Sequence, residues 1–155
     1  MSHKIEDIYR EFLSNVDDYA LTLQNRDEIS LLEEMFGHYK FARRKFDKSR
    51  ADLGTNYQSH RDVPEGEEML INDELSYQEV DIIIQLMLVS YLRPIINSNK
   101  VLRQALTDKD FNLTSQANHL NQLTIWYRRL QAEADKAMTK YTYRGLGEWY
   151  DNSWW

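Results

Sequence analysis

The sequence contains no cysteine and few of the residues that interrupt regular structure. It has 155 residues, among them five glycines and two prolines. The lack of cysteine excludes disulfides, thiolate metal sites and cysteine nucleophiles, and it is typical of proteins in a reducing compartment. The scarcity of glycine and proline disfavours long irregular segments. We therefore expect an all-α protein whose single core forms without covalent cross-links.

The chain also lacks an excess of positive charge. Its formal net charge is -6 and its pI is near 5.2. A protein that binds nucleic acid over its whole surface needs many lysines and arginines to neutralise the phosphates. The balance of charge therefore favours protein partners.

Long apolar runs are missing as well. Charges recur every few residues in the first twelve, where a secretory signal peptide would need an unbroken apolar core. The most apolar segment, residues 76–97, is interrupted by Asp81, Gln85, Ser90 and Arg93. It falls short of the roughly 20 apolar residues that a bilayer span requires. We therefore expect neither secretion by this route nor a membrane partner.

Residues 76–97 are nevertheless the segment around which we expect the rest to fold. Apolar residues occur on nearly every side of its helical period, and a helix of this kind is buried on all sides. Ser76 and Glu79 have the spacing of a capping box, which predicts the start of the helix. Pro94 lacks an amide hydrogen and crowds the preceding turn, so it predicts a kink or an end near residues 92–93.

Apolar spacings of three and four predict the other helices at about residues 4–24, 28–53 and 115–140, with a short helix at 100–107. Asp27 is the expected N-cap of the second helix and Gly54 its expected C-cap. The sequence thus predicts a four-helix bundle-like domain with a central buried helix. A long loop, residues 54–74, separates the second and third helices, and it is either a binding element or a mobile linker.

A basic stripe occupies the end of the second predicted helix. Its members are Lys40, Arg43, Arg44, Lys45, Lys48 and Arg50. Asp47 is the only acidic residue in the same segment. One interpretation is that the stripe contacts an acidic surface, which belongs either to an oligomer neighbour or to nucleic acid. The other is a solvated helix face whose lysine stems cover apolar surface.

The last residues of the chain differ in character from the predicted domain, residues 1–142. Residues 143–155 are rich in aromatic side chains, and we expect them to form an extended docking tail. Its candidate docking residues are Tyr143, Arg144, Leu146, Trp149, Tyr150, Trp154 and Trp155. Such a tail either folds back on its own domain or inserts into a groove of another chain, where Trp and Tyr are typical hot-spot residues. Exposure to water is disfavoured, because each buried Trp removes about 200 Å² of surface from water.

No constellation of catalytic residues is recognisable. The four histidines are scattered, and neither a serine elbow nor a glycine-rich phosphate loop is present. Asp108, Asp110 and Asn112 copy the first half of a calcium loop, but Leu113 and His119 stand where an EF-hand has glycine and glutamate. We predict that these three residues form a structural turn. We expect no enzymatic activity, no metal and no cofactor.

Three segments carry a resemblance to a known family. They are FARRKFDKSRADL, the run from LSYQEVDIII to NHLNQL, and KYTYR. The most specific pattern is carried by Asp108, Lys109, Asp110, Phe111, Leu113, Ser115, Asn118 and Leu120. Over residues 40–145 the chain resembles the head–tail connector adaptors, which are neck proteins of tailed bacteriophages.

The resemblance implies a structural subunit of the virion neck, made in the cytoplasm of the bacterial host. Copies would form a homo-oligomeric ring beneath the portal protein and contact tail or further neck proteins. Double-stranded DNA would pass through the ring without specific binding, which suits a negative overall charge. The tail would dock on the portal. The basic stripe would lie at a subunit interface, facing the Glu65–Glu68 segment or the portal.

Two other functions remain open. The alternative is a cytoplasmic helical-bundle interaction or regulatory module whose aromatic tail is its docking motif. A helical nucleic-acid binder that uses residues 40–50 is weaker, because the overall charge is acidic.

Overall fold

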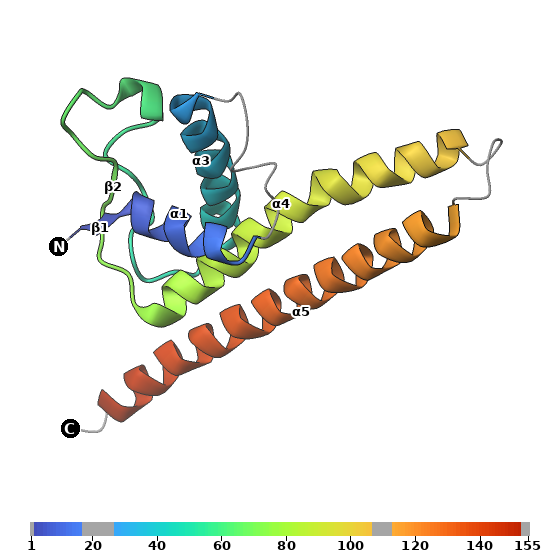
Figure 1. The fold of residues 1–155 in the computed structure, drawn as a ribbon. Helices are drawn as coiled ribbons and strands as arrows, with labels where there is room; N and C mark the ends of the chain where they lie inside the picture. The colour runs from blue at the N-terminus through green and yellow to red at the C-terminus, as the bar shows by residue number, and fades with distance from the viewer. Residues whose placement is uncertain (1, 17–26, 107–112, 153–155) are drawn as a thin grey trace.

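The computed structural model describes residues 2–16, 27–106 and 113–152, with side-chain surroundings for residues 2–16, 27–98 and 118–144 (Figure 1). In chain order the elements are β1 (His3–Lys4), α1 (Ile5–Ser14), α3 (Glu28–Lys45), the 3-10 turn η1 (His60–Asp62), β2 (Leu70–Ile71), α4 (Tyr77–Leu106) and α5 (Leu113–Asn152). Helices dominate these residues, which confirms the all-α class.

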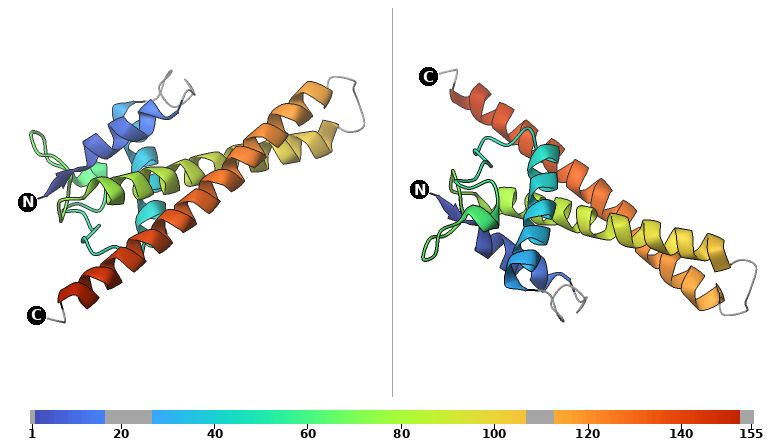
Figure 2. Two further views of the ribbon diagram at one scale, coloured as in Figure 1. Left: turned by 90° about the horizontal axis from the view of Figure 1, so that it is seen from below. Right: turned by 90° about the horizontal axis from the view of Figure 1, so that it is seen from above.

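The two longest helices determine the shape of the molecule. The helices α4 and α5 run antiparallel as a hairpin, while α1 and α3 pack on the first half of α4 (Figures 1 and 2). The second half of α4 and the first half of α5 extend away from this group as a two-helix arm. The fold is therefore a small helical core joined to a long hairpin.

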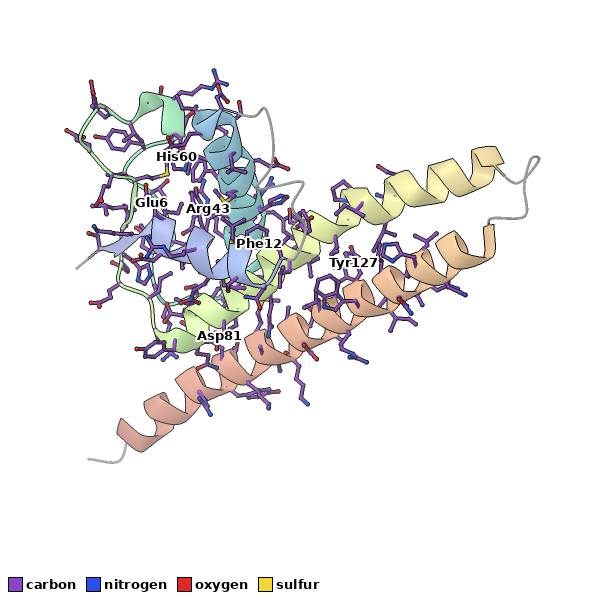
Figure 3. The ribbon with its side chains drawn as sticks, in the orientation of Figure 1. Glu6, Phe12, Arg43, His60, Asp81 and Tyr127 are labelled. Carbon is purple, nitrogen blue, oxygen red and sulfur yellow. The ribbon has the colours of Figure 1, made fainter. Side chains whose placement is uncertain are left out.

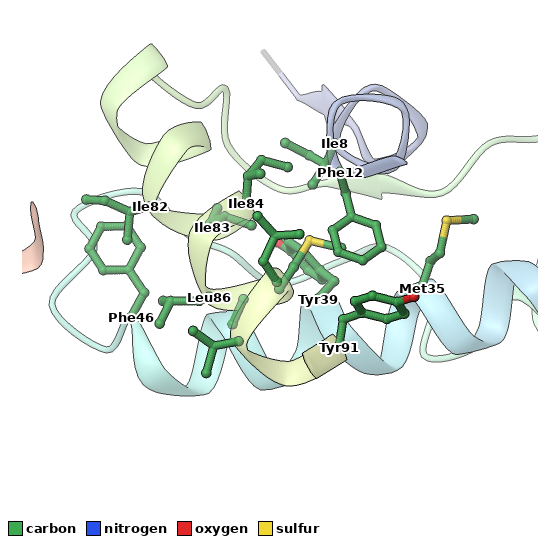
Figure 4. Packing of buried hydrophobic residues seen from close by; sticks show 14 of the residues in the cluster. Ile8, Phe12, Met35, Tyr39, Phe46, Ile82, Ile83, Ile84, Leu86 and Tyr91 are labelled. Carbon is green, nitrogen blue, oxygen red and sulfur yellow. The ribbon is translucent and has the colours of Figure 1, made fainter. Parts of the chain in front are cut away.

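The first half of α4 is the centre of the core, as predicted. Ile82, Ile83 and Met87 are almost fully buried there, and Phe12 of α1 and Tyr39 of α3 pack around them (Figure 4). The predicted cap is also present, because the Ser76 hydroxyl accepts the amide of Glu79 at 3.3 Å and donates to its carboxylate at 3.0 Å. Burial of this segment removes many apolar side chains from water and so stabilises the fold.

The predicted end of the first helix is wrong. Helix α1 stops at Ser14, where the Ser14 hydroxyl and the side-chain amide of Asn15 both donate to the carbonyl of Glu11 and so satisfy a free carbonyl of the last turn. Residues 17–26 of the predicted helix lie outside the described residues.

The second helix starts as predicted and ends early. Asp27 caps α3 by accepting the amide of Ser30 at 3.0 Å. The helix ends at Lys45 instead of residue 53, because Phe46 leaves the helical conformation and places its ring in the core with 1% exposed. Gly54 is therefore not a C-cap. It passes so close to Asn72 that an added Cβ would lie 2.8 Å from the side-chain nitrogen of that residue.

Helix α4 continues through Pro94 to Leu106, so the helix does not end near residues 92–93, and the prediction of a separate short helix at 100–107 is wrong. Proline removes one helical hydrogen bond, but Pro94 lies on an exposed side of the helix while Leu92 and Ile96 remain buried. Burial of these neighbours offsets the lost hydrogen bond.

Helix α5 continues beyond the predicted end at residue 140. It runs through Gly145 and Gly147 to Asn152. The prediction of an extended tail is therefore wrong for residues 143–152, which are helical.

A long connector, residues 46–76, joins α3 to α4, and it includes the predicted loop. Its strand β2 pairs with β1 through His3 opposite Ile71 and Lys4 opposite Leu70. Gly66, with φ at +85°, forms the turn before this strand. The buried side chains of the connector belong to Phe46, Leu53, Met69, Ile71 and Leu75. The connector is thus a packed part of the folded core.

Candidate docking surface

Tyr141 of α5 joins the beginning of the connector to the long hairpin. Its side chain is 2% exposed, and its hydroxyl accepts the Arg50 amide at 2.9 Å and the Arg50 Nε at 3.3 Å. The Arg50 guanidinium lies 4.7 Å from the centre of the tyrosine ring, and the Phe46 ring meets that ring edge-on at 5.1 Å. Residues 46–50 are therefore fixed beside one turn of α5.

The contacts of Tyr141 fix one end of the predicted basic stripe, at Arg50. Lys40 and Arg43 lie over the Phe36 ring, at 4.8 and 6.0 Å, and Arg43 projects from α3 (Figure 3). Lys45 lies 5.8 Å from the Phe41 ring, so stems of this stripe do cover apolar surface. Arg44, Lys45 and Lys48 are exposed.

The same turn of α5 carries two of the predicted docking residues. Tyr143 is 68% exposed, and Arg144 is exposed one turn beyond Tyr141. Lys140 is exposed next to Tyr141 on the other side. The structure thus brings the basic stripe and the start of the predicted tail together, although the sequence assigned them to different contacts.

The rest of the predicted tail continues in the direction of α5. Leu146, Trp149 and Tyr150 belong to the helix, and their side chains lie outside the description. Trp154 and Trp155 lie outside the described residues, as do the predicted turn residues Asp108, Asp110 and Asn112. The C-terminal end of α5 runs past the start of α4 (Figures 1 and 2).

The acidic segment proposed as a partner of the basic stripe has contacts of its own. Glu68 forms an ion pair with Lys4 at 3.0 Å, and Glu67 accepts a hydrogen bond from the Tyr57 hydroxyl. Neither glutamate pairs with the basic stripe within the described residues. These two side chains instead hold the connector to β1 and to itself.

A partly buried polar cluster fixes the middle of the connector. Glu33 of α3 accepts the Ser59 hydroxyl at 2.7 Å and the amide of His60, and the His60 ring lies 2.7 Å from the Tyr9 hydroxyl (Figure 3). Desolvation raises the pKa of Glu33, but these hydrogen bonds outweigh it and leave the pKa lowered. Desolvation also lowers the pKa of His60. The cluster joins α1, α3 and η1, which indicates a structural role.

His38 occupies a second polar position inside the core. Its Nδ1 lies 2.9 Å from the Ser90 hydroxyl, and Phe12 and Tyr91 surround its ring. Its Nε2 is buried without a hydrogen-bond partner, and desolvation lowers its pKa. The neutral imidazole therefore fits this position better than the charged form.

Residues 2–16, 27–106 and 113–152 contain no group of three or more histidine, aspartate and glutamate side chains that could hold a metal ion. Within the same residues, no helix combines the length and the apolar character that a membrane crossing requires.

Two functional candidates escaped the sequence analysis. Tyr141 looked like an ordinary core residue of the last helix, because nothing local indicates that residues 46–50 reach it. Tyr77 follows the predicted cap Ser76 and is 93% exposed. An aromatic residue in the first turn, beside the polar residues Ser76 and Gln78, was the available indication of this exposure.

Comparison with known proteins found no matching family model, curated protein or solved structure. The resemblance to connector adaptors therefore stays a prediction.

Proposed function

We propose that this chain is a structural subunit of a tailed-bacteriophage neck, a head–tail connector adaptor that acts through its surfaces and not through chemistry. Copies form a ring below the portal protein and leave a channel for double-stranded DNA. The C-terminal part of α5 docks on the portal, and other surfaces meet tail or further neck proteins. The subunit is located in the virion neck.

The single observation that best supports this proposal is the course of α5. The helix packs on α4, contacts the connector through Tyr141 and then continues past the start of α4, so its last turns lie beyond their helical partner. Its sequence there includes Trp149 and Tyr150, residue types that dominate the binding energy of interfaces. A helix that extends beyond its own domain is suited to enter a groove of a neighbouring protein.

The bundle-like arrangement belongs to the same proposal. Helices α1 and α3 pack on the first half of α4, whereas none of the described helices lies as a third helix beside the arm of α4 and α5 (Figures 1 and 2). We propose that the bundle is completed when neighbouring subunits of the ring pack against this arm. Ile125 and Trp126, which are 58% and 38% exposed on α5, would then be covered.

Deletion of residues 148–155 tests the docking role. We expect the truncated chain to keep the helical content of residues 2–144 and to lose binding to the portal protein of the same phage. The measurements are circular dichroism and co-purification with the portal. Global unfolding of the truncated chain would contradict the proposal, because it would place these residues in the core.

Electron microscopy of the purified protein with its portal tests the ring. The expected result is a symmetric ring of copies on one end of the portal. A monomer or dimer without affinity for the portal would favour the interaction or regulatory module instead.

A further inference from the structure

The charges of this chain are segregated between two surfaces. Residues 62–81 contain eight acidic residues and neither lysine nor arginine. Lysine and arginine gather where the end of α3 and the connector meet α5. We call this second region the basic surface; it consists of Lys45, Lys48, Arg50, Lys140 and Arg144.

The basic surface is held together by contacts around Tyr141. Phe46 and Arg50 both touch that ring, so Lys48 lies between two fixed points. Lys140 and Arg144 lie four residues apart on one side of α5. Lys45, Lys48, Lys140 and Arg144 are exposed, and the structure records no ion pair for these four within the described residues. These four side chains therefore present positive charge on a rigid base.

The opposite charge is concentrated at the start of α4, which we call the acidic end; it consists of Glu74, Tyr77 and Asp81. Tyr77 is 93% exposed, and Asp81 lies one helical turn later at the start of α4 (Figure 3). Glu74 is exposed just before the cap Ser76. An exposed aromatic ring between two carboxylates has the composition of an interface hot spot with a charged rim.

We propose that copies of this chain associate by placing the acidic end of one copy on the basic surface of another. The two carboxylates meet the lysines, and the Tyr77 ring lies against the cationic side chains. The Glu65–Glu68 segment is a poorer partner, because Glu67 and Glu68 are already engaged by Tyr57 and Lys4. The role of this contact in a ring rests on the proposed function, but the contact itself does not.

A second copy fits the basic surface better than nucleic acid does. Residues 62–81 and the basic surface belong to the same small core. The acidic residues of that segment would therefore repel a DNA backbone that binds to the basic surface. An acidic protein surface carries far fewer negative charges than a DNA backbone and is therefore repelled less, and the chain itself supplies such a surface with a protruding aromatic ring.

Charge exchange in the full chain tests this contact. Sedimentation equilibrium gives the dissociation constant of self-association for the wild type, for Lys45→Glu with Lys48→Glu, for Glu74→Lys with Asp81→Lys, and for all four together. Each reversed pair should raise the dissociation constant at least about tenfold, and the fourfold exchange should restore it. Tyr77→Ala should also weaken association about tenfold.

Two controls separate this effect from misfolding. Arg128→Glu with Glu133→Lys changes exposed charges elsewhere on α5 and should leave the dissociation constant unchanged. Lysines at the start of α4 oppose the helix dipole, so Glu74→Gln with Asp81→Asn provides a milder pair that should also weaken association.

Several results would overturn the inference. A wild type that stays monomeric up to about 1 mM would do so, as would reversed pairs that leave association unchanged or a fourfold exchange that does not restore it. Binding of a duplex DNA fragment that is lost with Lys45→Glu and Lys48→Glu, while self-association persists, would assign the basic surface to nucleic acid. Portal binding by a chain that never self-associates would refute this contact and leave the proposed docking role of α5 intact.

Discussion

Replacement of Tyr141 should release the connector from α5. In Tyr141→Phe the ring stays, but the Arg50 amide and Nε lose their shared acceptor. Water can reach Arg50, which is exposed, so the expected loss is about 1 kcal/mol of unfolding free energy. Tyr141→Ala also removes a side chain that is 2% exposed, for which large-to-small replacements cost about 3–5 kcal/mol.

The matched control lies two residues further along the same helix. Tyr143 is 68% exposed, so Tyr143→Phe and Tyr143→Ala should each change the unfolding free energy by less than about 0.5 kcal/mol. Urea denaturation followed by far-ultraviolet circular dichroism measures all four variants. A midpoint shift at constant slope would show that the change lies in stability and not in the extent of unfolding.

Hydrogen exchange gives this prediction a local test. The Arg50 amide donates to the Tyr141 hydroxyl, so its exchange should accelerate in Tyr141→Phe by about fivefold if the bond contributes about 1 kcal/mol. The reasoning fails if Arg50 exchanges at the wild-type rate in that variant. It also fails if Tyr141→Ala is no less stable than Tyr143→Ala.

Three further predictions concern the core. Burial lowers the pKa of His38 and His60, so below pH 6.5 the unfolded chain binds more protons than the folded chain. The contribution of each histidine to the unfolding free energy should be complete above pH 6.5 and should fall by at most about 1.4 kcal/mol per pH unit below it. Urea denaturation at a series of pH values measures this fall. Phe12→Ala should cost about 3–5 kcal/mol in the same assay, since Phe12 is fully buried beside Tyr91 and His38. Pro94→Ala should raise the thermal midpoint by restoring one helical hydrogen bond at an exposed position, and a lowered midpoint would contradict this account of α4.

The starts of the helices were predictable because their determinants are local. Asp27 and Ser76 each bond an amide three residues later, and such spacings can be recognised in a sequence. The burial of the apolar residues between 80 and 92 followed from their distribution on nearly all sides of the helix. These parts of the fold depend on neighbours within one or two turns.

The end of α3 and the course of α4 through Pro94 depended on distant residues. Helix α3 ends where Phe46 turns toward Tyr141, which belongs to the last helix. Pro94 and the two glycines at 145 and 147 lie in continuous helices, although their local preference is to interrupt one. At Pro94 the burial of Leu92 and Ile96 outweighs the preference of a single residue, so intrinsic preference is a weak guide there.

The candidate docking surface was also predictable only in its local features. The basic stripe was visible as a run of lysine and arginine, and its composition needed no structure. Its position beside Lys140 and Arg144 was not visible, because it depends on the Tyr141 contact across the chain. Tyr77 was missed because its exposure depends on which side of α4 the other helices cover.

The length of α5 affects how the isolated subunit behaves in solution. Forty helical residues at 1.5 Å each make a rod about 60 Å long, whereas a spherical protein of this mass has a diameter of about 40 Å. The frictional ratio should therefore exceed that of a sphere. A monomer would then leave a gel-filtration column early and mimic a dimer, so light scattering is the appropriate measure of its mass.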